Sequence, residues 1–488
     1  MRRAPAVALA IVAVSVLLSP LRRELYVGDE TKYTQVVREM RAGSFFLPTL
    51  EGSPFTHKPP LHFWIVDLLT YPFGVYSIWP FVLPSLVAFG LLLWLMHRFG
   101  GPMAAFVVGT SLLMWGSAQT ARMDVEFALL LALAAWFLWN DRKFAAGVAT
   151  GFATLVKGPM APVITIALFA FESIRLRRKP RARDLLALLP MIVIPLLWFV
   201  PAVILGGEAF WREIFYKQTV GRAVGAWVHR SPPWFYLVRA PLTLMPWFFL
   251  ALASLRAKDE KAKFARSWIL AVLVPYSLLS SKLDVYMIAM LPAVALLIAC
   301  GLESADAWSR RANLVMATLL AVIAVAALVV PVKGEYAALA TRMDVRVLFV
   351  ILLIASIAVF IITLRGTLIT STLATGLVLI LTLGYAAIAL VPLANEMASD
   401  RPLVRAIEAQ RVAPQEVALY VCPHLWVRGM NPDLWHALHV DADEIHAFDP
   451  RVIITRRKNA EEISDVLSRY ERVGELQMIG KPFDVYRK

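Results

Sequence analysis

Thirteen apolar runs follow one another along this chain of 488 residues, and they constrain its fold more than any other feature. Most of them have about the 20 apolar residues that a helix needs to cross a bilayer, although the fifth and sixth are shorter. Hydrophobic residues make up 59% of the chain and charged residues only 17%, whereas soluble domains have about 25% charged residues. A soluble globular enzyme and a disordered chain are therefore both excluded.

The apolar runs predict an α-helical polytopic membrane protein with about 13 transmembrane helices. The predicted spans are residues 4–21, 78–97, 102–120, 123–140, 144–157, 159–174, 185–205, 234–254, 265–281, 285–303, 313–332, 345–364 and 368–392. The segment 61–73 is apolar but too short to span, and we expect it to lie flat on the membrane surface.

The net charge of +14 is unevenly distributed. Residues 395–488 contain 13 basic and 15 acidic residues, so the basic excess lies in the membrane region, residues 1–394. The C-terminal segment has the composition of a small soluble α/β domain. Alternating patterns in it predict strands and amphipathic helices. The strands are expected at 417–421, 451–455 and 483–486, and the helices at 401–411 and 461–472.

The basic residues of short loops predict the topology. They cluster at Arg142-Lys143, at Arg175–Arg183, at Arg256–Arg266 and at Arg310-Arg311, and the positive-inside rule places such loops in the cytoplasm. The N-terminus is then cytoplasmic. With thirteen spans, the C-terminal domain lies on the outer face of a bacterial inner membrane, in the periplasm. We expect no nucleic-acid partner.

Two long loops, residues 22–77 and 206–233, are expected on the outer face. In the first, Asp29 and Glu30 are adjacent and accompany Lys32 and Lys58. Acids and bases gathered at the membrane surface suit proton transfer or the binding of an anionic headgroup. Alternatively, Asp29 only caps a surface helix and Lys58 only extends its ammonium group toward water.

Further polar motifs interrupt the apolar region in sequence order. They are Arg122-Met-Asp124, Leu155-Val-Lys-Gly-Pro159, Trp211-Arg-Glu-Ile-Phe215, Arg222, His229-Arg-Ser-Pro-Pro-Trp234, Met245-Pro-Trp247 and Ser281-Lys-Leu-Asp-Val-Tyr286. Each has a purely structural interpretation as well. Asp124 could cap the helix that begins there, and Lys157 could mark a water-facing helix end.

These motifs, together with Leu47-Pro-Thr-Leu-Glu-Gly52 and Lys58-Pro-Pro-Leu61, resemble the aminoarabinose transferases of lipid A. They are also similar to the wider protein O-mannosyltransferase superfamily. The resemblance implies a GT-C fold with juxtamembrane helices on the outer face. It also implies a glycosyltransferase that uses a polyprenyl-phosphate sugar donor, with inversion at the anomeric carbon. It covers residues 1 to about 300.

The resemblance also implies roles for particular residues, which match the family's motifs one by one. The catalytic residues would be Asp29, Glu30 and Asp124. The donor phosphate would be bound by Lys32, Lys58, Arg222 and Lys282. Other substrate contacts would come from Tyr33, His57, His229 and Tyr286. Cations are expected here because the phosphate gains charge as it leaves, and fixed charges outside bulk water stabilise that change strongly.

Two positions depart from the family pattern. His57 replaces a carboxylate that is linked to a bound metal in the family, and Asp284 stands where the family usually has proline. No cofactor is therefore certain, although a divalent metal is possible. His57 and His229 would be weak candidate ligands because two histidines alone do not define a site.

The sequence predicts transfer of a sugar from undecaprenyl phosphate to a lipid A-like or other cell-envelope glycolipid. One alternative is the same chemistry on Ser or Thr of exported proteins. The non-enzyme alternative is a lipid or glycan transporter. Transporters place ionisable residues near the middle of the membrane, whereas the spans here are nearly free of charge.

Overall fold

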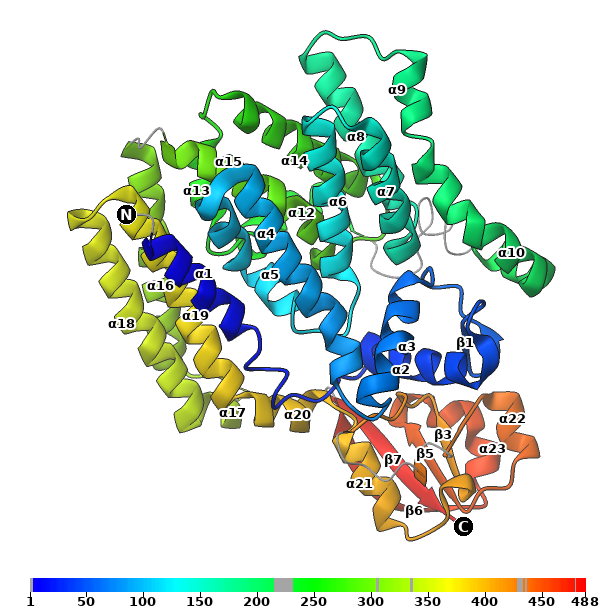
Figure 1. Ribbon diagram of the computed structural model, residues 1–488. Helices are drawn as coiled ribbons and strands as arrows, with labels where there is room; N and C mark the ends of the chain where they lie inside the picture. Colours follow the sequence, from blue (N-terminus) through cyan, green and yellow to red (C-terminus); the bar gives the residue numbers. More distant parts are fainter. Residues whose placement is uncertain are drawn as a thin grey trace. The chain divides into compact units, whose positions relative to one another are not determined.

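The computed structural model describes residues 3–214, 231–303, 307–333, 337–427, 433–434, 437–478 and 480–488. It is a mostly helical protein with one small mixed sheet near the C-terminus (Figure 1). By internal contacts the chain divides into two compact units. The larger unit comprises residues 1–19, 56–62 and 83–389, and the smaller comprises residues 20–55, 63–82 and 390–488.

Most helices lie in the larger unit. The first eight are α1 (Arg3–Ser15), α4 (Trp79–Gly109), α5 (Leu112–Ser117), α6 (Asp124–Trp139), α7 (Lys143–Lys157), α8 (Met160–Arg175), α9 (Ala182–Ala187) and α10 (Pro190–Arg212). The others are α12 (Phe235–Thr243), α13 (Phe248–Ser254), α14 (Glu260–Leu278), η3 (Asp284–Met290), α15 (Leu291–Glu303), α16 (Ala307–Val329), α17 (Ala337–Thr341), α18 (Met343–Arg365) and α19 (Leu368–Ala389).

Six helices of the described chain are long and apolar enough to cross a membrane, and the bent pair α12 and α13 would make a seventh. This number is lower than thirteen because several predicted spans form shorter helices. Helices α6, α7 and α8 have 16, 15 and 16 residues. At about 1.5 Å per residue, each is shorter than the roughly 30 Å of a bilayer core.

One predicted span differs in shape from the expectation. The segment 234–254 was expected to be one helix, but α12 and α13 meet at an angle of 110°. The segments 78–97 and 102–120 were expected to be separate, and α4 indeed contains two helices that meet at a kink at Gly101, although the second ends at Gly109 and is followed by α5. Gly101 has a φ of 78°, a conformation that residues with a Cβ adopt only with strain. The segment 61–73 does form a helix, α3 (Leu61–Phe73).

Helices α7 and α10 pack closely because α7 presents two glycines. A Cβ on Gly151 would lie 2.8 Å from the Pro190 carbonyl oxygen, and one on Gly147 would lie 3.0 Å from that of Leu188. Small residues four positions apart allow such close approach of helices in membranes. The glycine spacing therefore positions α7, whose last residue is Lys157.

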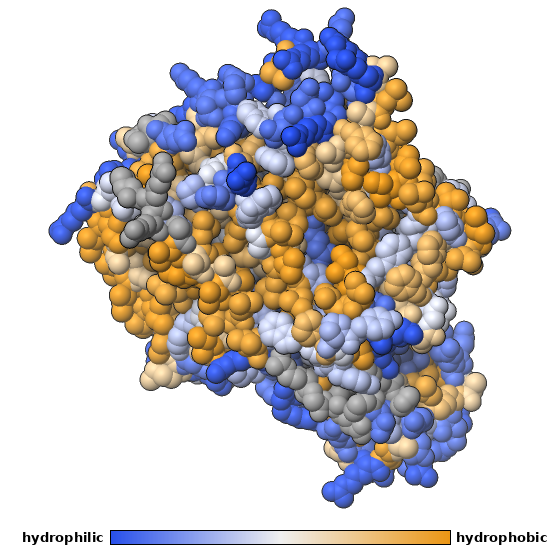
Figure 2. Space-filling view, viewed as in Figure 1, coloured by the Kyte–Doolittle hydropathy of each residue, from blue (hydrophilic) through white to orange (hydrophobic). Residues whose placement is uncertain are grey.

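The surface of the larger unit is apolar where its helices face outward. Figure 2 shows a broad hydrophobic area on one face of the molecule. On α10, Ile204 is 75% exposed and Leu205 is 65% exposed. A soluble protein would bury such side chains, so these surfaces are suited to lipid. The structure is thus that of a multi-pass membrane protein.

The smaller unit contains a five-stranded mixed sheet with the order β4-β3-β5-β7-β6. Its strands are β3 (Val417–Tyr420), β4 (Leu438–Val440), β5 (Val452–Arg456), β6 (Glu471–Met478) and β7 (Lys481–Arg487). Strand β3 pairs in parallel with β4 and β5, and β7 pairs antiparallel with β5 and β6. The remaining elements are α2 (Asp29–Glu39), η1 (Met40–Ser44), β1 (Thr49–Leu50), β2 (Ser53–Pro54), α20 (Val391–Ala398), α21 (Arg401–Ala409), η5 (Pro414–Glu416), α22 (Ala442–Ala447), η7 (Arg457–Ile463) and α23 (Ser464–Leu467).

Both faces of the sheet are covered. Leu403 and Ile407 of α21 pack on Leu419 and Ile454, whereas Ile445 of α22 packs with Ile453 on the other face. Because successive strand residues point to opposite faces, a strand covered on both sides is apolar throughout. This explains why β3 and β5 were predicted correctly from their apolar runs.

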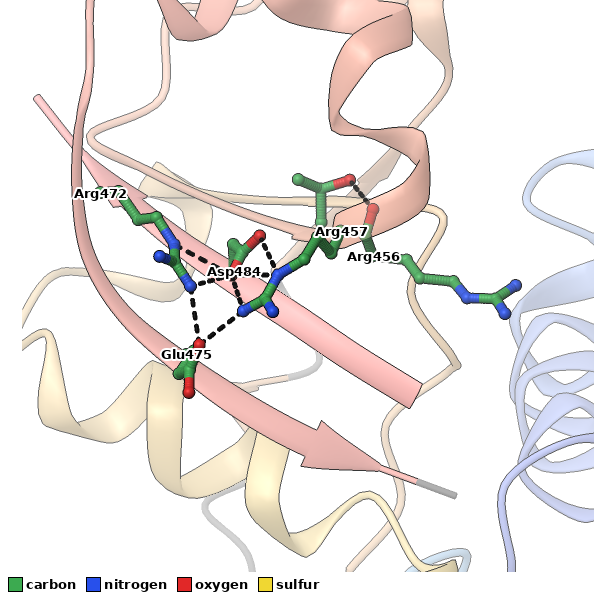
Figure 3. Close-up of polar contacts among 6 residues, drawn as sticks. Arg456, Arg457, Arg472, Glu475 and Asp484 are labelled. Atoms are coloured by element: carbon green, nitrogen blue, oxygen red, sulfur yellow. Dashed lines mark hydrogen bonds and ion pairs between the residues drawn. The ribbon is translucent and has the colours of Figure 1, made fainter. Parts of the chain in front are cut away.

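Polar strands were harder to predict. Strand β6 falls partly in the expected helix 461–472, which instead forms η7, α23 and the start of β6. Its stability comes from charge as well as packing. Figure 3 shows Arg457 and Arg472 donating to Asp484 and Glu475. Side chains from η7, β6 and β7 are thus joined in one network.

Candidate active site

The predicted site residues are divided between the two units. Asp29, Glu30, Lys32 and Tyr33 belong to the first turns of α2 in the smaller unit. The larger unit contains His57, Lys58, Asp124, Lys282 and Tyr286. Arg222 and His229 lie outside the described residues. Each group is therefore considered within its own unit.

Helix α2 begins at Asp29, with Gly28 in the capping position. Asp29 is thus the first helical residue rather than the cap, and its half-buried carboxylate lies where the helix dipole favours negative charge. Lys32 follows three residues later, on the same side of the helix. An acid and a cation are therefore neighbours at the start of α2.

Glu30 is buried and interacts with Arg23. The two groups form a two-pronged ion pair, with Arg23 Nη1 3.1 Å from Glu30 Oε1. Glu30 Oε2 also accepts the backbone N–H of Tyr26 at 2.7 Å. These contacts hold the chain just before α2 in place. Glu30 is therefore positioned to orient the start of α2, on which Asp29 lies.

Tyr33 is 2% exposed and lies among aromatic rings. Its ring centre is 5.2 Å from that of Phe63 and 6.5 Å from that of Phe55, in edge-to-face contacts. Such contacts are typical of packed cores. The ring of Tyr33 therefore anchors α2 to the chain that follows the β1–β2 hairpin.

In the larger unit, Asp124 lies at the start of α6 and is 1% exposed. Its carboxylate accepts hydrogen bonds from Lys157 at the end of α7 and from Arg122, whose Nε lies 2.9 Å away. The alternative of helix capping fails, because the capping position is Met123. Lys157 is also not a water-facing helix end, since its side chain is only 8% exposed.

Two rings border the ammonium group of Lys157. Its Nζ lies 5.2 Å from the ring centre of Tyr286 and 5.4 Å from that of Phe127. Rings at this distance attract a cation through their negative faces. Tyr286 in turn stacks on Tyr276 at 5.0 Å between ring centres. Asp124, Lys157 and Tyr286 thus form one cluster, contributed by α6, α7 and η3.

The segment Ser281–Tyr286 contributes two further charged residues. Lys282 is 3% exposed, and its ammonium group donates to the backbone carbonyls of Leu279 and Ser231, the latter at 2.9 Å. A phosphate would have to share that group with the two carbonyls. Asp284 pairs with Arg239 of α12, with Nε and Oδ1 2.8 Å apart. This pair accounts for an acid where the family usually has proline.

His62 and Glu126 form a buried pair that the sequence analysis missed. His62 Nδ1 lies 3.0 Å from both carboxylate oxygens of Glu126, and the two residues are 1% and 7% exposed. Glu126 follows Asp124 by two residues at the start of α6. The sequence could have indicated this pair, because His62 and Glu126 are ionisable residues within apolar runs, and such residues are costly in a membrane.

The remaining loop residues precede α3. His57 is exposed and Lys58 is half-buried. Across the described residues, a single group of three potential metal ligands is present, formed by Glu51, His424 and His439 of the smaller unit. It includes neither His57 nor any other residue that the sequence analysis singled out as a ligand.

The fold and these clusters define a class: a polytopic membrane protein with charged residues at helix ends and a small mixed α/β unit. No protein-family model matches the chain. The structure is similar to ArnT from Cupriavidus metallidurans bound to undecaprenyl phosphate, with a TM-score of 0.76 and 21% sequence identity. That match covers 98% of this chain and 96% of the other. The apo state of the same protein gives a TM-score of 0.74.

Sequence comparison points to the same proteins. The chain is 27% identical over 366 residues to the undecaprenyl phosphate-alpha-4-amino-4-deoxy-L-arabinose arabinosyl transferase of Serratia proteamaculans. It is 28% identical over 324 residues to that of Yersinia pestis. The matches cover 67% and 60% of this chain but 65% and 58% of the relatives' lengths, less than two thirds. The resemblance predicted from the motifs is confirmed: the chain is a distant homologue of these transferases and shares the fold of ArnT.

Proposed function

We propose that this protein is an integral-membrane glycosyltransferase that moves a sugar, aminoarabinose in the first instance, from undecaprenyl phosphate to lipid A or a related envelope glycolipid. The observation that carries the proposal is the match of nearly the whole chain to ArnT bound to undecaprenyl phosphate. The names of the sequence relatives support the same sugar and the same lipid carrier.

The proposed topology has thirteen spans, with the N-terminus in the cytoplasm and the residues after α19 on the outer face of the inner membrane. Short helices such as α6 to α8 would then cross the apolar layer with help from polar residues at their ends. The apolar outward surface of the larger unit supports this arrangement.

In the proposed reaction, the C–O bond between the anomeric carbon and the phosphate breaks as the acceptor oxygen attacks from the opposite face. The departing undecaprenyl phosphate gains negative charge, and Lys58, Lys32, Arg222 and Lys282 are the candidates to stabilise it. If the acceptor is a hydroxyl group, Asp29 takes its proton. If the acceptor is a phosphate of lipid A, no base is needed, and Asp29 orients the reacting groups.

The chemistry makes Lys58 and Asp29 the residues to test. We expect Lys58→Ala and Asp29→Asn to reduce the transfer rate by about 10² or more, the usual cost of losing a group that stabilises developing charge. The assay uses proteoliposomes that contain undecaprenyl-phosphate aminoarabinose and lipid A, with the product identified by mass spectrometry. Lys481→Ala, at an exposed position on β7, is the matched control.

Unchanged transfer in both variants would overturn the site assignment. Absence of product with the wild-type protein would overturn the donor and acceptor assignment. In that case, a mass-spectrometric comparison of glycolipids and exported glycoproteins from cells with and without the gene would identify another substrate.

A further inference from the structure

Three potential metal ligands meet in the smaller unit, and none of them is a residue assigned to sugar transfer. They are Glu51, in the turn between β1 and β2, His424, which follows β3, and His439 on β4. Glu51 Oε1 lies 3.8 Å from Nδ1 of His424 and 3.7 Å from Nδ1 of His439. The two imidazole ring centres are 4.7 Å apart.

The backbone holds Glu51 in an unusual conformation. Its φ is 55°, and that of Gly52 is 74°, so both turn residues have the positive φ of a type I′ hairpin. A side chain in this region is disfavoured and persists only where its surroundings hold it. The strained backbone position therefore carries a carboxylate, that of Glu51, at the tip of the hairpin.

Glu39 supplies the support that the turn needs. Its carboxylate accepts the backbone N–H groups of Glu51 at 2.7 Å and Gly52 at 3.2 Å, and the hydroxyl of Thr49 at 2.7 Å. The Glu39 carboxylate thus fixes the turn from behind, while the Glu51 carboxylate lies beside the two histidines.

The two imidazoles are largely buried and face the carboxylate. Glu51 Oε1 lies close to Nδ1 of both His424 and His439, and one ligand atom from each of the three side chains lies within 4.8 Å of the others. Imidazole nitrogens and carboxylate oxygens are both common metal ligands.

A cavity gives access to the three ligands. Its volume is about 600 Å³, and its lining includes Glu51, His424 and His439. The Glu51 side chain is 49% exposed, whereas those of His424 and His439 are 13% and 19% exposed. An ion can therefore enter from solvent and meet ligands that are largely fixed.

We propose that Glu51, His424 and His439 bind a divalent transition-metal ion, with Zn²⁺ as the first candidate. Two imidazole nitrogens and one carboxylate oxygen are a common zinc ligand set. Bonds of about 2.0–2.1 Å at tetrahedral angles put ligand atoms about 3.3 Å apart, so the observed separations need only a small closing movement. Imidazole ligands favour Zn²⁺ or a similar ion over Mg²⁺ and Ca²⁺.

The ion would connect the β1–β2 hairpin to the end of β3 and to β4. Residues more than 370 positions apart in the chain would then share one bond network. Three protein ligands leave a fourth position for water or an anionic group, as in open zinc sites. The consequence is a hairpin whose conformation depends on the metal.

The test is a calorimetric titration of ZnCl₂ into the full-length, tag-free protein in detergent, after treatment with EDTA. We expect the double variant His424→Ala/His439→Ala to bind one equivalent fewer than wild type. The control His97→Ala, at an exposed position on α4, keeps the full stoichiometry. Glu39→Gln should weaken binding by roughly 10–100-fold, the usual effect of losing an outer partner of a ligand.

A second measurement keeps the proposal testable if the double variant folds poorly. X-ray absorption at the zinc edge should show scattering from imidazole ligands in the wild-type complex. In the Glu51→Gln variant, the imidazole scattering should remain and only the contribution of oxygen ligands should decrease. Equal stoichiometry and affinity in wild type and the double variant, or a spectrum without imidazole ligands, would overturn the proposal. No sugar donor is present, so the result is independent of the proposed transferase activity.

Discussion

Asp124 has a different role in the structure from the helix-capping role that its position in the sequence allowed. Its position at a span start was compatible with capping, but its carboxylate instead pairs with Lys157 and Arg122. A buried acid and a buried base offset one another's desolvation only while both are present. The pair therefore also joins the start of α6 to the end of α7.

We predict that Asp124→Asn lowers the free energy of unfolding by about 3–5 kcal/mol, because it leaves the Lys157 ammonium group buried without its anion. Lys157→Met alone should also destabilise, but by less, because Arg122 still pairs with the buried carboxylate. The double variant should lose less than the sum, with a coupling of about 0.5–3 kcal/mol. Thermal unfolding in detergent measures the cycle, and strictly additive effects would contradict the pairing.

At the scale of elements, the packing of helix α7 depends on two positions without a side chain, Gly147 and Gly151. Gly147 lies against Leu188, just before α10, and Gly151 lies against Pro190 and Ile194 in the first turns of α10. Packing of this kind has no room for a side chain, and lipid offers no hydrophobic driving force to compensate for a lost contact. The position of Lys157 at the end of α7 follows from this close packing.

Gly151→Ala is expected to destabilise by about 1–3 kcal/mol, the usual cost of overpacking. Its new Cβ would lie 2.8 Å from the Pro190 carbonyl oxygen and 2.9 Å from Ile194 Cβ. The matched control is Gly116→Ala in α5, where nothing lies within 4 Å of the added atom. The control should be neutral or slightly stabilising because alanine favours helix. Equal melting temperatures for the two variants would rule out the steric explanation.

For the whole molecule, the number of spans decides on which side of the membrane the C-terminus lies. Six of the described helices pass the length and composition criteria, and the bent pair would make seven. An even number places both termini on one side, whereas seven or thirteen places them on opposite sides. Whether the shorter helices α6 to α8 each cross the membrane therefore decides on which side the C-terminus lies.

We expect an alkaline phosphatase fusion after Lys488 to be active and a fluorescent-protein fusion at the same place to be dark, because the segment should be periplasmic. A fusion within residues 176–181, the basic loop after α8, should behave in the opposite way. An inactive phosphatase at the C-terminus would exclude an odd number of spans and the proposed location of the smaller unit.

The sequence by itself determined the membrane class, the helical character and the covered strands β3 and β5. These follow from apolar runs whose period and length are local properties. It also indicated Asp29, Lys58 and Asp124 as candidates, because ionisable residues beside apolar segments are conspicuous. The confirmed resemblance rests on the same local motifs.

Only the tertiary structure decided which of these side chains meet. The partner of Asp124 is 33 residues away, and that of His62 is 64 residues away. Polar strand β6 is recognisable only through its pairing with β7. Glu51, His424 and His439 carry no shared motif, and they come together because the fold places a first-loop turn beside the end of β3 and beside β4 in the smaller unit. Such distant contacts depend on packing, which local sequence does not encode.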